Sequence, residues 1–256
     1  LPKDISATQA GIYAKAYRLF DAGNNISYLF SVILLPLFAS VIKKGEDLQS
    51  LVKQSFSLML TMTCSIAIVC IFYSHNLMEV LYPKNGDELV EIYNSRISES
   101  SKILQILMGS FVSISVTYIF GTLLTANGSL KQLNFVAAFG VIINISLNLL
   151  FIPIFKAKGA AFTSLCVQFT TCLIQYIIAK KIFDIKLGAK FWSSTLSFIV
   201  LTTISTIFLK NTSINWIYSF LIALLFSVII AFITRMLDYK ELKNLILSST
   251  TYIKKQ

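Results

Sequence analysis

Long apolar runs alternate with short polar links along the whole chain. A window of about 20 residues, the length that a helix needs to cross roughly 30 Å of hydrocarbon, finds seven candidate spans. Turn-forming links such as Asn127-Gly128 separate them. The pattern predicts an all-α integral membrane protein, a polytopic helical bundle of about seven transmembrane helices. The expected spans are Ala22 to Ile42, Ser57 to Leu81, Ile103 to Ala126, Leu133 to Ile152, Ala160 to Ala179, Trp192 to Leu209 and Ile217 to Met236.

Composition supports this fold class and excludes others. Hydrophobic residues make up 55% of the chain and charged residues 13%, whereas about 25% of a typical soluble domain is charged. The formal net charge of +10 would suggest a nucleic-acid partner in a soluble protein. Here the basic residues gather in the links between apolar runs, where they set membrane topology. We therefore expect contact with membrane lipid and no binding of nucleic acid.

The basic residues also predict an orientation. Alternate sides of the seven spans hold 13 and 9 Lys and Arg residues, and the cytoplasmic side of a membrane protein holds the excess. The sequence therefore predicts a multi-pass protein with a cytoplasmic C-terminus and, because the number of spans is odd, an external N-terminus.

The ends of the chain carry further expectations. The chain starts at Leu1 without an initiator Met, and we interpret residues 1–256 as the C-terminal transmembrane half of a larger protein. Within it, residues 1–21 form the outer end of the first helix and residues 22–236 contain the seven spans. Residues 237–256 place Leu242, Leu245 and Ile253 at helical spacing, which predicts a cytoplasmic amphipathic tail; the alternative is a frayed basic tail.

Residues suited to catalysis are scarce. His75 is the single histidine and lies near a span end, where it is more often a polar anchor than a catalyst. The cysteines have six-residue spacings that fit neither zinc nor a redox pair. No paired carboxylates occur in or beside the spans. We therefore expect neither an enzyme, nor a metal site, nor a cofactor. The cysteines are Cys64, Cys70, Cys166 and Cys172.

Polar stripes inside the spans are the stronger signal, because intramembrane polar groups usually face other helices or a water-filled cavity. Arg18, Asp21 and Asn25 follow the spacing that places them on one helix face. If the helix begins before residues 11–13, Arg18 would face an internal cavity and could bind an anionic substrate. The alternative is that Arg18 and Asp21 only anchor the outer interface.

A second set of polar residues lies in the fourth and fifth spans. Asn144 and Asn148 are four residues apart, and Gln168 and Gln175 share a face of the next span. Amide groups of this kind can hydrogen-bond sugars without carrying charge. They serve equally well as interhelical contacts worth roughly 0.6 to 2 kcal/mol each, and both interpretations remain open at this point.

Three sequence elements resemble the polysaccharide flippases of the multidrug/oligosaccharidyl-lipid/polysaccharide exporter superfamily. Residues 11–19, Gly-Ile-Tyr-Ala-Lys-Ala-Tyr-Arg-Leu, are similar to the family's Gly-x-Tyr-x-x-Ala-x-Arg-Leu segment. Residues 144–153 are similar to its Asn-x-x-Leu-Asn-x-x-x-x-Pro element, and Gly-Ala-Ala follows at 159–161. Lys156 departs from the pattern, which commonly has glycine there.

The resemblance implies a protein of fourteen helices, of which this chain supplies the second six-helix lobe, without its first helix, and two peripheral helices. It implies that lipid-linked oligosaccharides of the undecaprenyl-diphosphate type, O-antigen precursors among them, are flipped across the bacterial cytoplasmic membrane by alternating access. Cationic groups such as Arg18 would then neutralise the diphosphate. The partners would be that lipid and the missing N-terminal half.

Two other classes of protein compete with the flippase. A drug/cation antiporter of the same superfamily should carry a buried acid, and besides Asp21 no acid lies in or beside a span interior. An integral-membrane polysaccharide polymerase or acyltransferase should carry a large outer loop with catalytic groups. The longest outer link, residues 83–102, offers mostly charged residues that we expect to be solvated.

Overall fold

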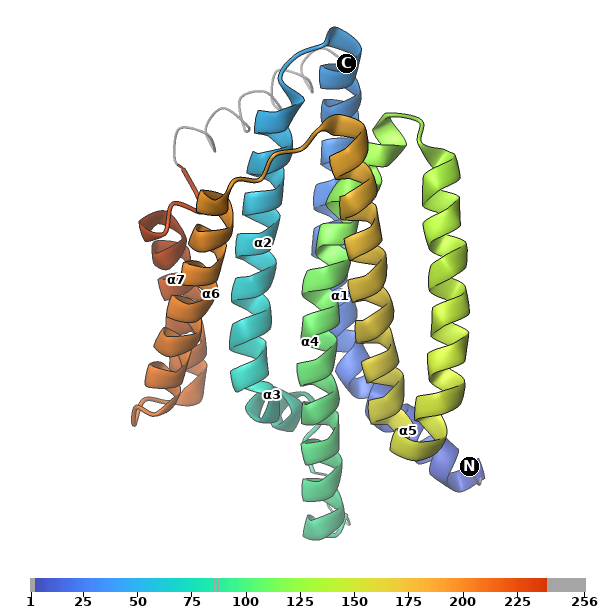
Figure 1. Ribbon diagram of the computed structural model, residues 1–256. Helices are drawn as coiled ribbons and strands as arrows, with labels where there is room; N and C mark the ends of the chain where they lie inside the picture. Colours follow the sequence, from blue (N-terminus) through green and yellow to red (C-terminus); the bar gives the residue numbers. More distant parts are fainter. Residues whose placement is uncertain (1–2, 85, 87, 239–256) are drawn as a thin grey trace.

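The computed structural model describes residues 3–84, 86 and 88–238, and for residues 3–6 it describes the backbone alone. Within these residues the chain forms seven α-helices that build one upright bundle with a short helix across its lower end (Figure 1). The helices are α1 (Lys3–Lys44), α2 (Leu48–Phe72), α3 (Ser74–Leu81), α4 (Val90–Ala126), α5 (Leu130–Phe183), α6 (Ala189–Lys210) and α7 (Trp216–Ile233).

The predicted fold class, a helical polytopic membrane protein, is confirmed. Six of the described helices are long and apolar enough to cross a membrane. One of them, α5, consists of two helices that meet at Lys156, where the backbone leaves the helical region. We call residues 130–155 the first arm and residues 157–183 the second arm. The arms run in opposite directions (Figure 1), so the bundle contains the seven antiparallel segments expected from the sequence.

Three helix boundaries differ from the prediction. Helix α1 starts at Lys3, because its early turns bury Ile12 and Ala16 against the rest of the bundle. Helix α2 ends at Phe72, and the predicted remainder of that span is the separate helix α3. Helix α4 begins at Val90, so most of the link expected to be solvated is helical. Its added turns bury Ile97.

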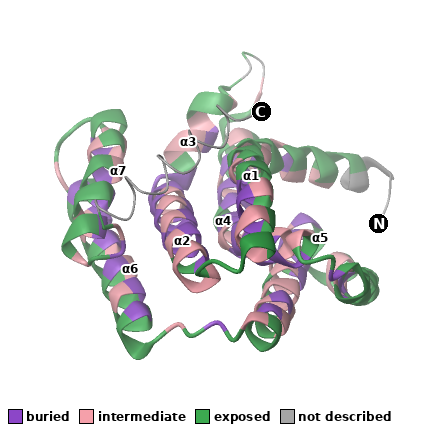
Figure 2. Ribbon diagram, turned by 90° about the horizontal axis from the view of Figure 1, so that it is seen from above, coloured by how far each residue is buried: buried purple, intermediate pink, exposed green. Residues whose placement is uncertain are grey.

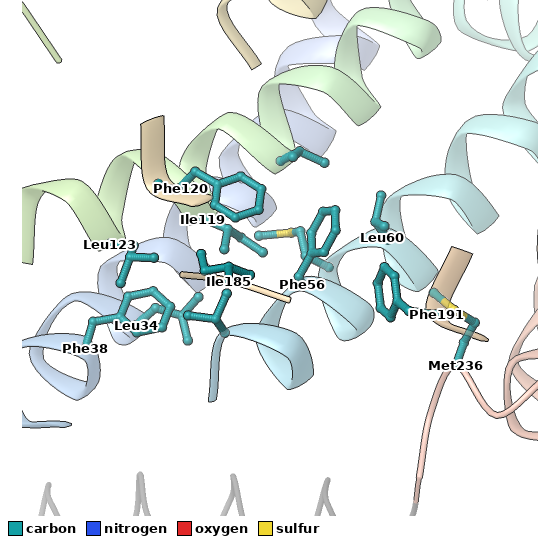
Figure 3. Packing of buried hydrophobic residues seen from close by; sticks show 14 of the residues in the cluster. Leu34, Phe38, Phe56, Leu60, Ile119, Phe120, Leu123, Ile185, Phe191 and Met236 are labelled. Atoms are coloured by element: carbon teal, nitrogen blue, oxygen red, sulfur yellow. The ribbon is translucent and has the colours of Figure 1, made fainter. Parts of the chain in front are cut away.

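The core lies around α4, which packs against α1 on one side and the second arm on the other. Small residues permit the close approach of α1: Gly23 lies against the Phe111 ring, and the hydroxyls of Ser27 and Ser115 are 2.8 Å apart. Towards the upper end, aromatic and aliphatic side chains of α1, α2, α4 and α6 form one apolar cluster (Figure 3). Helix α4 is therefore the central helix, against which α1, α2, α3 and α5 pack.

The bend in α5 depends on two unusual backbone positions. Lys156 has φ 54° and ψ −131°, a conformation that glycine adopts readily and other residues rarely. This explains why the resembled motif has glycine at that position. Three residues later the backbone of Gly159 passes so close to Phe151 that an added Cβ would lie 2.3 Å from its carbonyl oxygen. The Asn-to-Pro and Gly-Ala-Ala elements therefore build a tight helical hairpin.

Lys156→Gly is expected to stabilise the protein by about 1 kcal/mol, because it removes the steric cost that a Cβ pays at positive φ. Lys156→Ala is the matched control, since it removes the charge but keeps the Cβ. Unfolding in mixed detergent micelles measures both variants. Equal stabilisation by the two variants would show that the lysine charge, and not the backbone, sets the cost.

Helices α6 and α7 lie at one edge of the bundle, where they pack against each other and α2, as expected of peripheral helices (Figure 2). Phe191 of α6 stacks on Phe56 of α2 with ring centroids 5.5 Å apart. The Ser57 hydroxyl donates to the carbonyl of Met236, just beyond α7. The predicted tail at 237–256, with Leu242, Leu245 and Ile253, lies outside the described residues except for 237 and 238.

Candidate functional site

The candidate site is the side of the bundle where α1 and the first arm of α5 present exposed faces. Helix α1 and the arms of α5 pack on different sides of α4 and make few contacts with each other. Figure 2 shows the exposed residues along these outer helices. In their most apolar stretches, only 28% of α1 and 11% of α5 is buried, against 67% for α2. These two faces are therefore available to lipid or to another part of the protein.

Arg18, Asp21 and Asn25 lie on α1, and the helix starts well before them. The early start of α1 agrees with the premise of the cavity hypothesis, and the cavity itself stays a prediction. Arg18 and Asn25 are exposed and Asp21 is half-buried, because the opposite face of α1 carries the buried residues that pack on α4. Arg18 and Asp21, both described, form no ion pair with each other. The Arg18 guanidinium is left available to an anion.

Residues beside this stripe form a polar corner that the sequence analysis missed. Tyr118 of α4 contacts Tyr28 of α1 with ring centroids 5.9 Å apart, and its hydroxyl lies close to the side chain of Asn24. The side-chain oxygen of Asn24 is buried without a hydrogen-bond partner. The sequence signal was Asn24 itself, a polar residue inside an apolar helix. Its pairing with Tyr118 depends on tertiary packing and has no local signature.

Asn144 and Asn148 lie together on the first arm, where the Asn148 amide donates to the Asn144 side-chain oxygen at 2.9 Å. Both are half-buried and line a shallow, mainly apolar groove of about 360 Å³ with Ile152 and Pro153. The other oxygen, Asn148 Oδ1, is buried without a partner. The pair therefore offers hydrogen-bonding capacity beside an apolar surface.

Gln168 and Gln175 lie on the second arm, where Gln168 is half-buried and Gln175 is 9% exposed. The side chain of Gln175 packs against α4 so closely that a Cβ on Gly121 would lie 3.1 Å from its oxygen. Gln175 therefore packs between the helices, although its side-chain oxygen has no hydrogen-bond partner among the described residues. The predicted set is thus divided: the asparagines hydrogen-bond to each other, but no hydrogen bond in the described structure joins them or the glutamines to Arg18.

A polar network at the lower end holds the bend of α5 to α1 and α4. The Gln9 amide donates to Glu99 at 3.2 Å and its oxygen accepts from the Ala157 backbone N–H at 3.2 Å. Lys158 completes the network with its Nζ 3.8 Å from Glu99. The contacts join residues about 90 and 150 positions apart, which no spacing motif reveals. The network fixes how the first arm leaves the bundle.

Gln9→Ala is expected to lower the free energy of unfolding by about 1 to 2 kcal/mol, because the buried Ala157 N–H loses its acceptor. Glu99→Gln should cost about 0.5 kcal/mol or less, since it removes only a partly exposed ion pair. Detergent unfolding measures the stabilities, and hydrogen exchange of the peptide spanning the α5 bend should accelerate only in Gln9→Ala. Similar losses in the two variants would assign the stabilisation to Glu99.

Comparison with known proteins places these features in context. Residues 5–227 match the sequence profile of a family described as "Lipid II flippase MurJ". Among solved structures, one titled "Lipid II flippase MurJ, inward closed conformation" aligns with a TM-score of 0.73 at 15% sequence identity. The alignment covers 91% of this chain and 48% of that protein, so the chain spans about half its length. No curated protein sequence matches significantly.

Proposed function

Because this chain belongs to the MurJ family of lipid II flippases, we propose that it forms one lobe of a transporter that moves a lipid-linked precursor across a membrane. Lipid II is the substrate that the family's description supports. The resemblance to polysaccharide flippases pointed to the same superfamily, and the family match favours lipid II over O-antigen precursors as the substrate. The lobe would work by alternating access, as repeat-built transporters generally do.

The observation that supports this function most directly is the free cation on the open face of α1. Arg18 is exposed and shares α1 with Asp21 and Asn25 at the spacing of one helix face. A guanidinium binds phosphate oxygens through paired N–H donors, so Arg18 is suited to the diphosphate of such a lipid. The Asn144 and Asn148 amides would serve polar head groups on the opposing arm.

The structure also bears on the two competing classes, the drug/cation antiporter and the integral-membrane enzyme. Asp21 is half-buried and adjoins an exposed arginine, which is a poor environment for binding a cationic drug. Among the described residues, no group of three or more His, Cys, Asp or Glu side chains could hold a metal ion. The link from 83 to 102, where an enzyme would carry its catalytic loop, is largely occupied by the start of α4.

Complementation tests the proposed function. The full-length protein should restore growth to bacteria depleted of their own lipid II flippase, and it should fail to restore surface polysaccharide in a strain lacking its O-antigen flippase. Restored surface polysaccharide without restored growth would instead identify polysaccharide precursors as the substrate. Drug efflux without either activity would favour the antiporter.

Tagging the C-terminus for accessibility would test the proposed cytoplasmic location of that end in the bacterial inner membrane.

A further inference from the structure

A basic pocket lies at the upper end of the bundle, away from the face that carries Arg18. It has a volume of about 470 Å³ and lies between the start of α2, the α5–α6 link, the start of α6 and the segment after α7. Four cationic side chains line it, and Asp238 is the one acidic residue in the described part of the lining. The described lining thus has a formal charge of +3 (four cations and one carboxylate). The cations are Lys53, Lys186, Lys190 and Arg235.

Among the described residues, only one of the four cations has an ion-pair partner. Lys186 pairs with the exposed Asp184 at 2.7 Å. Lys53, Lys190 and Arg235 form no ion pair with any described residue. Like charges gathered around one cavity repel one another, and an anion in the cavity would remove that repulsion. The described lining of the pocket therefore favours a negatively charged ligand.

The N-terminus of α6 also favours an anion in this pocket. Its N-cap is Gly188, which supplies no side-chain acceptor, and its first turn contains no acidic residue. Helix α2, which begins beside the same pocket, is capped differently: Asp47 accepts from the N–H groups of Gln49 and Ser50. Free N–H groups and the helix dipole at α6 favour an anion. Lys190 places a positive charge in that first turn, which is unfavourable for the helix unless an anion is bound nearby.

The pocket has a fixed frame. The Gln49 side chain donates to the Lys186 carbonyl at 2.8 Å and accepts from the Lys186 backbone N–H at 3.1 Å. These two hydrogen bonds join the α5–α6 link to α2. Phe191 and Met236 also line the pocket; they are 7% and 4% exposed and lie close together near Phe56 and Leu60 (Figure 3). A lining that combines cations with buried apolar side chains suits a phospholipid, which has a charged head group and apolar chains.

We propose that this pocket binds a phosphate-bearing anion through Lys53, Lys190, Arg235 and the N-terminus of α6. The phosphate comes either from the head group of an anionic membrane lipid or from a soluble phosphate. Sites of 300 to 1,000 Å³ are of the usual size for small ligands, so the cavity accommodates a phosphate with the polar group that it carries. The site is separate from the proposed transport site and does not depend on it.

Thermal unfolding of the full-length protein in neutral detergent tests the proposal. Titration with phosphatidylglycerol is expected to raise the melting temperature saturably above the effect of equal phosphatidylcholine. The variant Lys53→Gln/Lys190→Gln/Arg235→Gln should need at least about tenfold more phosphatidylglycerol, because each cation near a membrane surface contributes about 1 kcal/mol. All three side chains are exposed, so the variant should fold.

The matched control is Lys43→Gln/Lys131→Gln/Lys181→Gln, which removes three exposed cations from the same end of the bundle without altering the pocket. It should titrate within about twofold of the parent. Inorganic phosphate that reproduces the shift and competes with the lipid would identify a soluble ligand, whereas a shift with lipid alone would identify the head group. The proposal fails if the pocket variant titrates like the parent, or if the control loses as much affinity as the pocket variant.

Discussion

Gly159→Ala is expected to lower the free energy of unfolding by about 3 kcal/mol or more, the upper end of the cost of overpacking. The new Cβ would lie 2.3 Å from the carbonyl oxygen of Phe151 and 2.6 Å from its carbonyl carbon. Both are backbone atoms, so no side chain can rotate to relieve the clash. The two arms of α5 would have to separate at the bend, and the lower-end network around Gln9 would be lost with them.

Gly11→Ala is the matched control, because Gly11 also lies in a helix but an added Cβ would meet nothing within 4 Å. Alanine should there raise stability by about 0.5 to 1 kcal/mol through its higher helix propensity. Urea or mixed-micelle unfolding measures both variants. If Gly159→Ala were as stable as the parent, the hairpin would have to be more open than the described backbone.

The sequence predicted the membrane spans well where burial in lipid alone determines the helix. The last two predicted spans differ by only a few residues from α6 and α7. They are Trp192 to Leu209 and Ile217 to Met236. Prediction was poorer where helices continue beyond the apolar run. The early turns of α1 are stabilised by a tertiary contact of Gln9 with Glu99, and the start of α4 by an ion pair of Arg96 with Glu88, just before the helix, at 2.9 Å. A hydropathy window has no access to such contacts.

The positions of the candidate site residues were predictable to a similar degree, while their roles stay a prediction. Arg18 stands out because a charged residue in an apolar helix is costly and a sequence motif surrounds it. The Asn144–Asn148 pair follows from helical spacing, and its hydrogen bond is observed. The basic pocket could not be anticipated, because Lys53, Lys190 and Arg235 come from three distant segments. Only the fold, with α6 and α7 packed on α2, brings their charges around one cavity.

Arg18→Ala is expected to abolish complementation of a lipid II flippase-depleted strain by the full-length protein. Loss of a charge-assisted, two-donor contact to a diphosphate should weaken binding of the lipid by about tenfold to a hundredfold. Arg18→Lys should recover part of the activity, since it keeps the charge but loses the fork of donors. Membrane levels should stay normal, because exposed Arg18 forms no hydrogen bond or ion pair with a described residue.

Lys210→Ala provides the comparison, because it removes an equally exposed cation from the last turn of α6, at the opposite edge of the bundle. It should complement like the parent. Binding of purified protein to the lipid-linked precursor then separates two roles for Arg18. A weaker affinity in Arg18→Ala, with no change in melting temperature, supports direct contact with the diphosphate. Full complementation by Arg18→Ala would reduce Arg18 to an interface anchor, and the transport site would have to be built from the asparagine pair and the Tyr118 corner.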